Sequence, residues 1–412
     1  MVKLFFSFLL FVSFLSLAQE NNSDNQNFDR SGGYARIQSL GNNPFVVDPE
    51  NMKTNPAYAA YYQNFLWGDL GSSKVGADNN GVGQFAGFSL KITPTLTVGG
   101  LLTRKDFQSN SIGLLDPTGV VSTVNSLLGV SRVVNLDNNL ELFGSYKLGN
   151  MVLGLGAAYA STTNKYTPAT GSGDEGTASQ FGLNAGLILE VNENLDVDVD
   201  ASLVLPSATY TPGTGSKTAA SNTLLMLDGR AFYKINPKLT LVPLINFGNI
   251  SGTVDQAGKS SDLSSSTIFG VGVGINYRTG DFLLAGGPSL MYSKTTDPSI
   301  PNISPETSSS SFEFPVWNIG AEWNLVSWLI ARFGYVASTG SDKWQNAVSA
   351  TKTEEYTRTV FGANDGATLG IGLRFGQFGL DAMVNEEILR QGFNNIGGGK
   401  ATLAYISASY AF

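Results

Sequence analysis

The stretch NENLDVDVDASLVLP, residues 192–206, alternates acidic and apolar side chains with a period of two. The acids are Asp196, Asp198 and Asp200, and Val197 and Val199 stand between them. Successive side chains of a β-strand point to opposite faces, so the stretch predicts a strand with one acidic face and one apolar face. In a soluble sandwich the acidic face would meet water. Which face is wet in this chain depends on the pattern elsewhere.

Apolar side chains recur at the same period along most of the chain. Unbroken apolar faces lie opposite small or polar ones in residues 181–189, 269–277 and 369–375. Short turns alternate with long polar connections, which fall near residues 162–177, 206–221, 250–266, 294–310 and 338–358. Tight turns on one rim and long loops on the other are typical of outer-membrane barrels, with lipid outside and a lumen inside. We therefore predict an all-β fold, a transmembrane antiparallel outer-membrane β-barrel over residues 64–412.

The alternating segments predict about sixteen strands, and fourteen is the alternative count. They fall near residues 64–72, 82–92, 95–104, 138–148, 151–161, 178–190, 194–205, 223–235, 238–249, 267–278, 281–293, 311–325, 328–338, 363–375, 377–385 and 400–412. An even number places both ends of the barrel in the periplasm.

The composition agrees with a membrane barrel. Charged residues make up 14% of the chain, Gly accounts for 48 of 412 residues, and the net charge of −8 argues against nucleic acid as a partner. The chain has no Cys and no His, which removes disulfides, thiolate chemistry and the commonest general base and metal ligand. We therefore expect no enzyme activity, no catalytic residues, no metal site and no cofactor.

The two ends carry targeting signals. Residues 1–18 contain Lys3, an apolar run and the small-x-small site ending at Ala18, which predicts a signal peptide followed by a flexible amino terminus, residues 19–33. The amphipathic last segment carries Tyr410 and the terminal Phe412, which resembles the signal read by the barrel-assembly machinery. We expect the protein in the outer membrane of a Gram-negative bacterium.

Residues 34–63, here called the hatch segment, lack the period of two. An acidic element, Asp48-Pro49-Glu50-Asn51, precedes the triplet Asn55-Pro56-Ala57 and an apolar stretch that leads into the first strand. This order of elements resembles the FadL-type outer-membrane transporters of long-chain fatty acids and other hydrophobic compounds. The resemblance implies that the hatch segment folds back inside the barrel, which has fourteen strands in that family. The alternative is a periplasmic tail preceding a general porin.

The acidic row belongs to the inner face if the apolar face meets lipid. We expect Asp196, Asp198 and Asp200 to face the lumen opposite Asp228, Arg230 and Lys234 of the next strand, or opposite the hatch segment. The alternative interpretation is a set of buried catalytic carboxylates, which normally lie in a defined pocket.

The connection after the third strand has apolar residues at helical spacing. Asp116 is a candidate cap and Pro117 suits a first helical position, and the residues concerned are Val120, Val121, Val124, Leu127 and Leu128. Such a helix at the extracellular rim either packs into the barrel mouth or, as the resemblance implies, forms part of a capture site for a hydrophobic ligand. The two roles are compatible.

Pro315 predicts a β-bulge. Proline removes a ladder hydrogen bond, and a closed barrel has no edge strand to accept it. The pattern also changes phase there, because Phe312 and Phe314 share one parity whereas Trp317 and Trp323 have the other. An inserted residue explains both observations.

Three functions fit this layout. The first is passive uptake of hydrophobic small molecules such as long-chain fatty acids through a barrel closed by the hatch segment. The second is a scaffold or anchor barrel that binds the proteins of an outer-membrane secretion system. The third is a general diffusion porin, which a sixteen-stranded barrel can accommodate. Outer-membrane lipid and the barrel-assembly machinery are the other expected partners.

Overall fold

The computed structural model describes residues 31–71, 85–104, 111–299, 305–384 and 403–412. The predicted signal peptide, residues 1–18, and residues 19–30 of the predicted flexible terminus lie outside these ranges. The helices of the described part are α2 (Tyr34–Ser39), η1 (Pro49–Lys53), η2 (Pro56–Ala60) and α3 (Val120–Leu128), where η denotes a 3₁₀ helix. Within the described ranges, none of the helices is long and apolar enough to cross a membrane.

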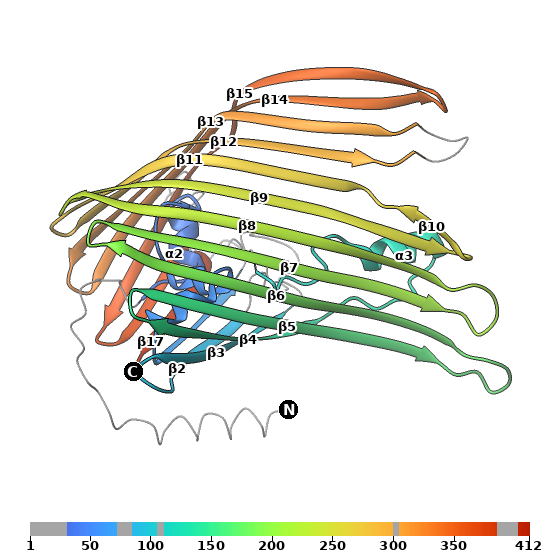
Figure 1. Cartoon of the computed structure of the whole chain (residues 1–412), viewed down its shortest axis with the longest axis horizontal. Coiled ribbons are helices and arrows are strands. Elements are labelled where there is room, and N and C mark those ends of the chain that lie inside the picture. The colour runs from blue at the N-terminus through green and yellow to red at the C-terminus, as the bar shows by residue number, and fades with distance from the viewer. Residues whose placement is uncertain (1–30, 72–84, 105–110, 300–304, 385–402) are drawn as a thin grey trace, which may run out of the picture.

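The described strands form one closed antiparallel sheet (Figure 1). They are β1 (Phe65–Gly71), β2 (Phe85–Lys91), β3 (Leu96–Arg104), β4 (Asn138–Leu148), β5 (Met151–Tyr166), β6 (Asp174–Asn192), β7 (Leu195–Thr211), β8 (Thr218–Asn236), β9 (Leu239–Gln256), β10 (Lys259–Asp262), β11 (Ser265–Thr279), β12 (Phe282–Asp297), β13 (Thr307–Val326), β14 (Leu329–Ser349), β15 (Lys352–Phe375), β16 (Phe378–Val384) and β17 (Leu403–Ala411). β1 pairs with both β2 and β17, which closes the ring. β10 pairs with β9 and β11 also pairs with β9, so sixteen of the seventeen described strands make up the barrel.

Each predicted segment corresponds to one strand of the ring, which confirms the predicted fold class. The long polar connections were predicted wrongly, because much of each is strand. β15 begins at Lys352 rather than near residue 363, and β14 continues to Ser349 rather than ending near residue 338. In these segments the strands continue to pair although neither face is apolar. The extra strand length therefore cannot be predicted from alternating apolar side chains.

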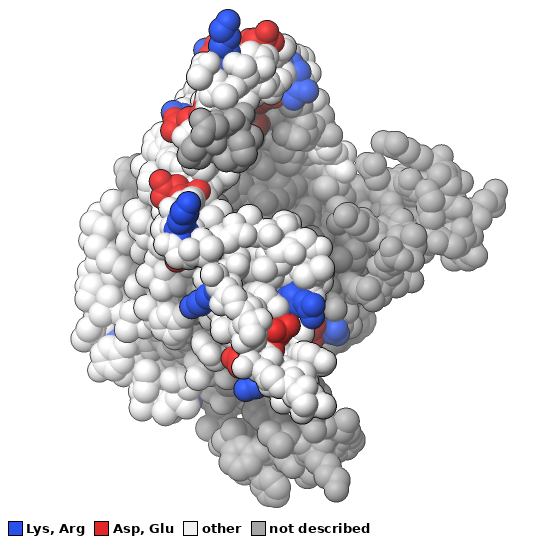
Figure 2. All heavy atoms as spheres, turned by 90° about the vertical axis from the view of Figure 1, so that its right-hand side faces the viewer, with Lys and Arg blue, Asp and Glu red and all other residues white. Residues whose placement is uncertain are grey.

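The outward face carries an apolar band between two levels of exposed aromatic side chains. At the short-turn end these are Tyr146, Tyr233, Trp323, Trp328, Phe375, Phe378 and Tyr410. Toward the long-loop end they are Tyr159, Phe181, Phe269, Tyr292, Phe312 and Phe314. Such belts mark the two interfaces of a bilayer, so the chain is an outer-membrane barrel. Figure 2 faces the long-loop end, where charged side chains of both signs are scattered over a mostly uncharged rim.

Pro315 lies in a break of strand register. The β13–β14 pairing shifts between Glu313 and Val316, and the β12–β13 pairing shifts between Ser289 and Met291 at the same level. A further shift between β14 and β15 adjoins Ser338, the partner of Val316. The structure thus places the predicted bulge within a row of irregularities across four strands.

Candidate functional site

The hatch segment begins with α2, and its two 3₁₀ helices follow from local capping. Asp48 accepts the Glu50 N–H at 3.0 Å, and the Asn51 side chain accepts the Asp48 N–H at 2.9 Å, which forms a capping box. Asn55 caps the next helix in the same way, because its side chain accepts the Ala57 N–H at 3.0 Å. Pro49 and Pro56 occupy first helical positions, where no N–H is needed. The triplet Asn55-Pro56-Ala57 is therefore a buried helix start.

Polar side chains from several sides of the barrel bind the hatch backbone. In Figure 1 the segment lies within the ring of strands, toward the short-turn end. Ser407 of β17 accepts the Ala35 N–H at 2.8 Å. Four inward side chains donate to carbonyl groups of the hatch segment. These are Thr368 of β15 to Ser39 at 2.9 Å, Asn318 of β13 to Gly41 at 3.0 Å, Asn276 of β11 to Phe45 at 2.8 Å, and Asn184 of β6 to Lys53 at 3.1 Å. The irregular backbone therefore finds partners on the inner face, as a buried segment requires.

Inward glycines make room for this segment. A methyl group added at Gly154 of β5 would collide with the Ala57 backbone, and one at Gly334 of β14 would collide with the Gly41 backbone. Gly186, Gly274 and Gly370 would likewise meet Asn55, Phe45 and Ser39. The inner face and the hatch segment are thus shaped to each other on β5, β6, β11, β14 and β15.

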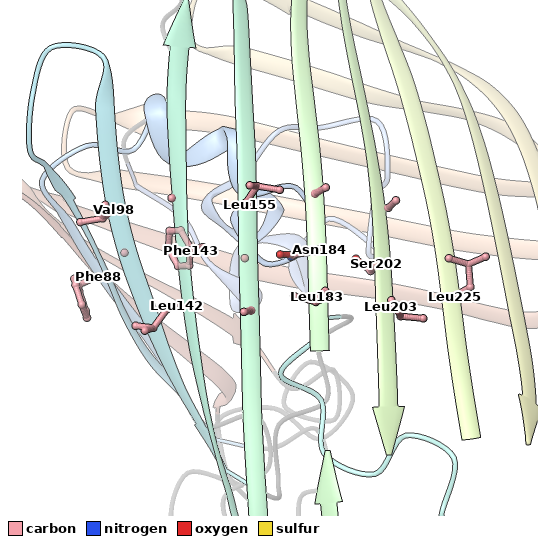
Figure 3. A pocket seen from close by; sticks show the side chains of 16 residues that line it. Phe88, Val98, Leu142, Phe143, Leu155, Leu183, Asn184, Ser202, Leu203 and Leu225 are labelled. Atoms are coloured by element: carbon pink, nitrogen blue, oxygen red, sulfur yellow. The ribbon is translucent and has the colours of Figure 1, made fainter. Parts of the chain in front are cut away.

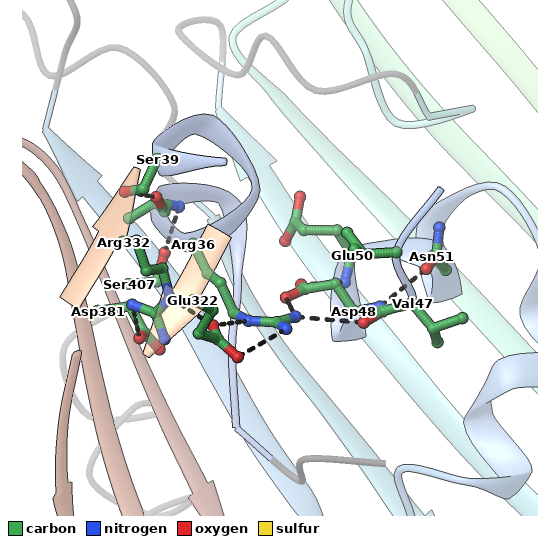
Figure 4. A network of polar contacts seen from close by, with 12 residues as sticks. Arg36, Ser39, Val47, Asp48, Glu50, Asn51, Glu322, Arg332, Asp381 and Ser407 are labelled. Carbon is green, nitrogen blue, oxygen red and sulfur yellow. Dashed lines mark hydrogen bonds and ion pairs between the residues drawn. The ribbon is translucent and has the colours of Figure 1, made fainter. Parts of the chain in front are cut away.

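A chain of buried ion pairs ties α2 to the strands near the end of the chain (Figure 4). Arg36 lies 2.8 Å from Asp48 and 2.9 Å from Glu322 of β13. Glu322 also accepts from Arg332 of β14 at 2.6 Å, and Arg332 lies 2.7 Å from Asp381 of β16. These five side chains are at most 7% exposed, so removing one would take an ion-pair partner from a buried charge.

Asp48 is the titratable hatch residue of this chain of ion pairs. Its burial raises the pKa of the carboxyl to about 7, although the Arg36 guanidinium acts in the opposite direction and the Glu50 carboxylate reinforces the rise. The residue therefore changes charge near neutral pH, beside the Arg36 side chain that joins the hatch segment to Glu322.

A second cluster holds the hatch segment on β7 and β8. Arg230 of β8 pairs with Asp198 of β7 at 2.7 Å and donates to the carbonyls of Pro44 and Val46 at 3.1 and 3.2 Å. The Tyr58 hydroxyl donates to Asp198. Burial, followed by the nearby Asp198 carboxylate, raises the pKa of the Tyr58 hydroxyl well above its usual value, so Tyr58 is a neutral donor. Every hatch group in this cluster is uncharged.

The other predicted inward charges lie beside this cluster on β7 and β8. Asp196 forms an ion pair with Lys234 at 3.3 Å. Asp200 and Asp228 are partners in the β7–β8 register. Of the predicted row, the structure therefore brings Asp198 and Arg230 together at the hatch segment and leaves the other three beside them.

The predicted apolar helix packs against small inward residues at the long-loop end. Val120, Val121 and Val124 of α3 are buried, whereas Leu127 is 42% exposed. Leu128 is partly buried against the same cluster, whose strand residues are Ala160, Ala178, Ala208 and Ala220.

The start of α3 differs from the prediction. Pro117 does not occupy the first helical position, because the helix begins at Val120 after a turn. The Asp116 carboxylate nevertheless accepts the N–H groups of Val120 and Val121 at 2.8 and 3.1 Å. The cap acts from four residues upstream, which allows the chain to turn before the helix starts.

The buried ion pairs of Arg36, Glu322, Arg332 and Asp381 were missed by sequence reasoning. A usable signal was present, because each barrel member is a charged residue at an inward position between apolar outward neighbours. The sequence shows this in LIARFGY, residues 329–335, and in GAEWN, residues 320–324. Nothing local indicates which of the many inward charges meets the hatch segment.

Comparisons with known proteins return outer-membrane barrels. No family model and no curated protein matches the chain. The Pseudomonas putida toluene transporter TodX, a FadL-type protein, matches at 12% identity over 93% of this chain and 99% of its own, with a TM-score of 0.37. The FrpB iron transporter of Neisseria meningitidis (F3-3 variant) matches at 13% identity over 82% of this chain, with a TM-score of 0.40, and this chain spans 63% of it, less than two thirds of its length. The copper transporter OprC matches at 13% identity over 77% of this chain and 60% of its own, with a TM-score of 0.36.

Proposed function

We propose that the barrel lets hydrophobic small molecules, such as long-chain fatty acids, diffuse inward across the outer membrane. In this proposal the hatch segment closes the lumen at rest and shifts to admit the ligand. The observation that carries it is the fit between the inward glycines and the hatch backbone. A glycine weakens its strand by forgoing side-chain packing, so several glycines on the inner face are accounted for by a segment that occupies the lumen at rest.

Apolar clusters at two heights inside the barrel support a hydrophobic ligand. α3 and the small alanines form one toward the long-loop end. Around η2, a second contains Tyr58 and Tyr62 with Trp67, Phe85 and Phe143 of the strands. Both clusters are buried while the hatch segment is in place. Apolar side chains of this kind, exposed when the segment shifts, would favour transfer of apolar molecules from water, whereas a hydrated general porin has a polar lumen.

The hatch segment is held unequally on its two sides, which suggests where it opens. On β13–β16 its own charged Arg36 pairs with Glu322 at 2.9 Å, so separation there would break a buried ion pair. On β7–β8 its groups are neutral, and Asp198 and Arg230 keep each other as partners when the segment leaves. We infer that the segment swings away from β5–β8 and stays attached at β13–β16.

Conductance and uptake test the proposal in lipid bilayers. The intact protein should be nearly closed to ions, and a variant lacking residues 19–63 should conduct much more. Heat-modifiable gel migration shows whether that variant forms a barrel. Proteoliposomes with the intact protein should take up a long-chain fatty acid faster than a sugar of similar mass. Equal conductance of the two proteins would remove the plug role and favour the porin. A closed barrel without fatty-acid uptake would favour the secretion scaffold.

A further inference from the structure

The outward face of strands β2 to β8 contains a hollow of about 820 Å³ (Figure 3). It runs between two rows of outward side chains that successive strands bring into register. Leu142, Leu183, Leu203 and Leu225 lie on one row, with Ala157 between Leu142 and Leu183. Gly144, Leu155, Ala185 and Ala201 lie on the next row. The hollow exists because Gly144, Ala185 and Ala201 interrupt a leucine-rich surface.

This groove lies within the hydrocarbon band. Tyr159 and Phe181, which are register partners, stand one outward position beyond it toward the long loops. Tyr146 stands one outward position beyond it toward the short turns. Between these levels, the lining side chains that point outward are all apolar in the part of the chain that the structure describes. Water and lipid headgroups would therefore find no partner in it.

The dimensions suit a single extended hydrocarbon chain. Neighbouring strands lie about 4.8 Å apart, so a groove crossing seven strands is roughly 25–30 Å long. Successive outward residues on a strand are about 7 Å apart, which sets the spacing of the two rows. An α-helix with its side chains is about 10 Å wide and does not enter such a groove. A second barrel presents a convex wall, which would cover the groove without filling it.

We propose that this groove binds one acyl chain of a membrane phospholipid, laid across β2–β8 on the outside of the barrel. An empty hollow would forfeit the dispersion contacts of its lining, and an extended chain restores them along the whole length. The site is separate from the lumen and does not depend on the proposed transport function.

Photolabelling in proteoliposomes tests the site. A phospholipid with a diazirine at mid-chain should label groove peptides of the full chain several-fold more than outward peptides of β13–β14. The variant Ala185→Leu with Ala201→Leu fills the groove and should reduce this labelling to the β13–β14 level. The matched control, Ala321→Leu with Ala331→Leu, places the same leucines at outward positions of β13 and β14 and should leave groove labelling unchanged.

Native mass spectrometry supplies a second measurement that does not rely on the variant folding. The wild-type protein released into mild detergent should retain a phospholipid. Uniform labelling around the barrel, a covalent dimer through groove residues, or labelling by a diazirine fatty acid but not by the phospholipid would each overturn the assignment.

Discussion

Arg36 of the hatch segment and Glu322 of β13 form a buried ion pair, with the Arg36 Nε atom 2.9 Å from a Glu322 carboxylate oxygen. Glu322 holds Arg332 at the same time, so the pair joins a mobile element of the proposed mechanism to the barrel wall.

Arg36→Gln should loosen the hatch segment strongly. Removing one partner of a buried ion pair costs about 3–5 kcal/mol, and here both Asp48 and Glu322 lose Arg36. Single-channel recordings should show a large rise in open probability. Lys165→Gln is the control, because its pair with Glu175 is 66% and 45% exposed and is worth at most about 1 kcal/mol. A closed Arg36→Gln channel would refute the anchoring role.

Tyr58→Phe should open the β7–β8 side without harming the barrel. The change removes the hydrogen bond that Tyr58 donates to Asp198, worth about 1.5–3 kcal/mol because the acceptor is charged, and the one that Arg230 donates to the Tyr58 hydroxyl at 3.3 Å. Arg230 still pairs with Asp198. Open probability should rise roughly tenfold or more, and the thermal unfolding temperature should stay unchanged. Tyr159→Phe, on the outward face, should change neither quantity.

Gly154→Ala should displace the hatch segment by crowding. The added methyl group meets the Ala57 backbone, and overpacking costs about 1–3 kcal/mol. Limited proteolysis should cut residues 34–63 faster than in the wild type. Gly248→Ala is the control, because Gly248 also points inward and the nearest atom to the new methyl carbon would be 3.7 Å away. Equal cutting of both variants would mean that crowding at Gly154 is not felt.

Asp48 predicts a pH dependence of hatch docking. Its pKa of about 7 when folded exceeds the unfolded value of about 3.9, so the docked state binds more protons. This contribution to docking is full below about pH 4 and is lost as pH rises through about 7. Arg36 and Glu50 face the same carboxyl, and Glu322 faces it across Arg36.

Proteolysis of residues 34–63 should therefore accelerate between about pH 4 and 7 in the wild type. Asp48→Asn removes the titrating group and should flatten the profile. A variant profile as steep as that of the wild type would assign the pH dependence to another group.

Single cysteines test the faces of β7 directly, because the chain contains no native Cys. Cysteines at residues 197 and 199 should react with a lipid-phase label, and cysteines at residues 196, 198 and 200 should not. The reverse pattern would invert the assigned inner and outer faces of the strand.

The sequence was sufficient for the elements that depend on local side-chain alternation. Within the membrane band, burial and lipid contact impose a period of two, so the strands and their inner faces were readable from segments such as residues 192–206. The extents of β14 and β15 were not readable, because above the membrane neither face needs to be apolar. The helix starts at Asn55 and near Asp116 depend on capping residues nearby in sequence, and both carried a local signal.

The attachment of the hatch segment was decided by the tertiary structure alone. Arg36 and Glu322 are 286 residues apart, and they meet because ring closure brings β13 to the side of the lumen where α2 lies. The buried Arg36 guanidinium must have an acidic partner, but the sequence alone does not show which of the inward acids it meets. Arg36 pairs with Glu322 rather than with Asp198, and the neutral Tyr58 donates to Asp198. Both contacts follow from where the folded hatch backbone fits between the inward glycines.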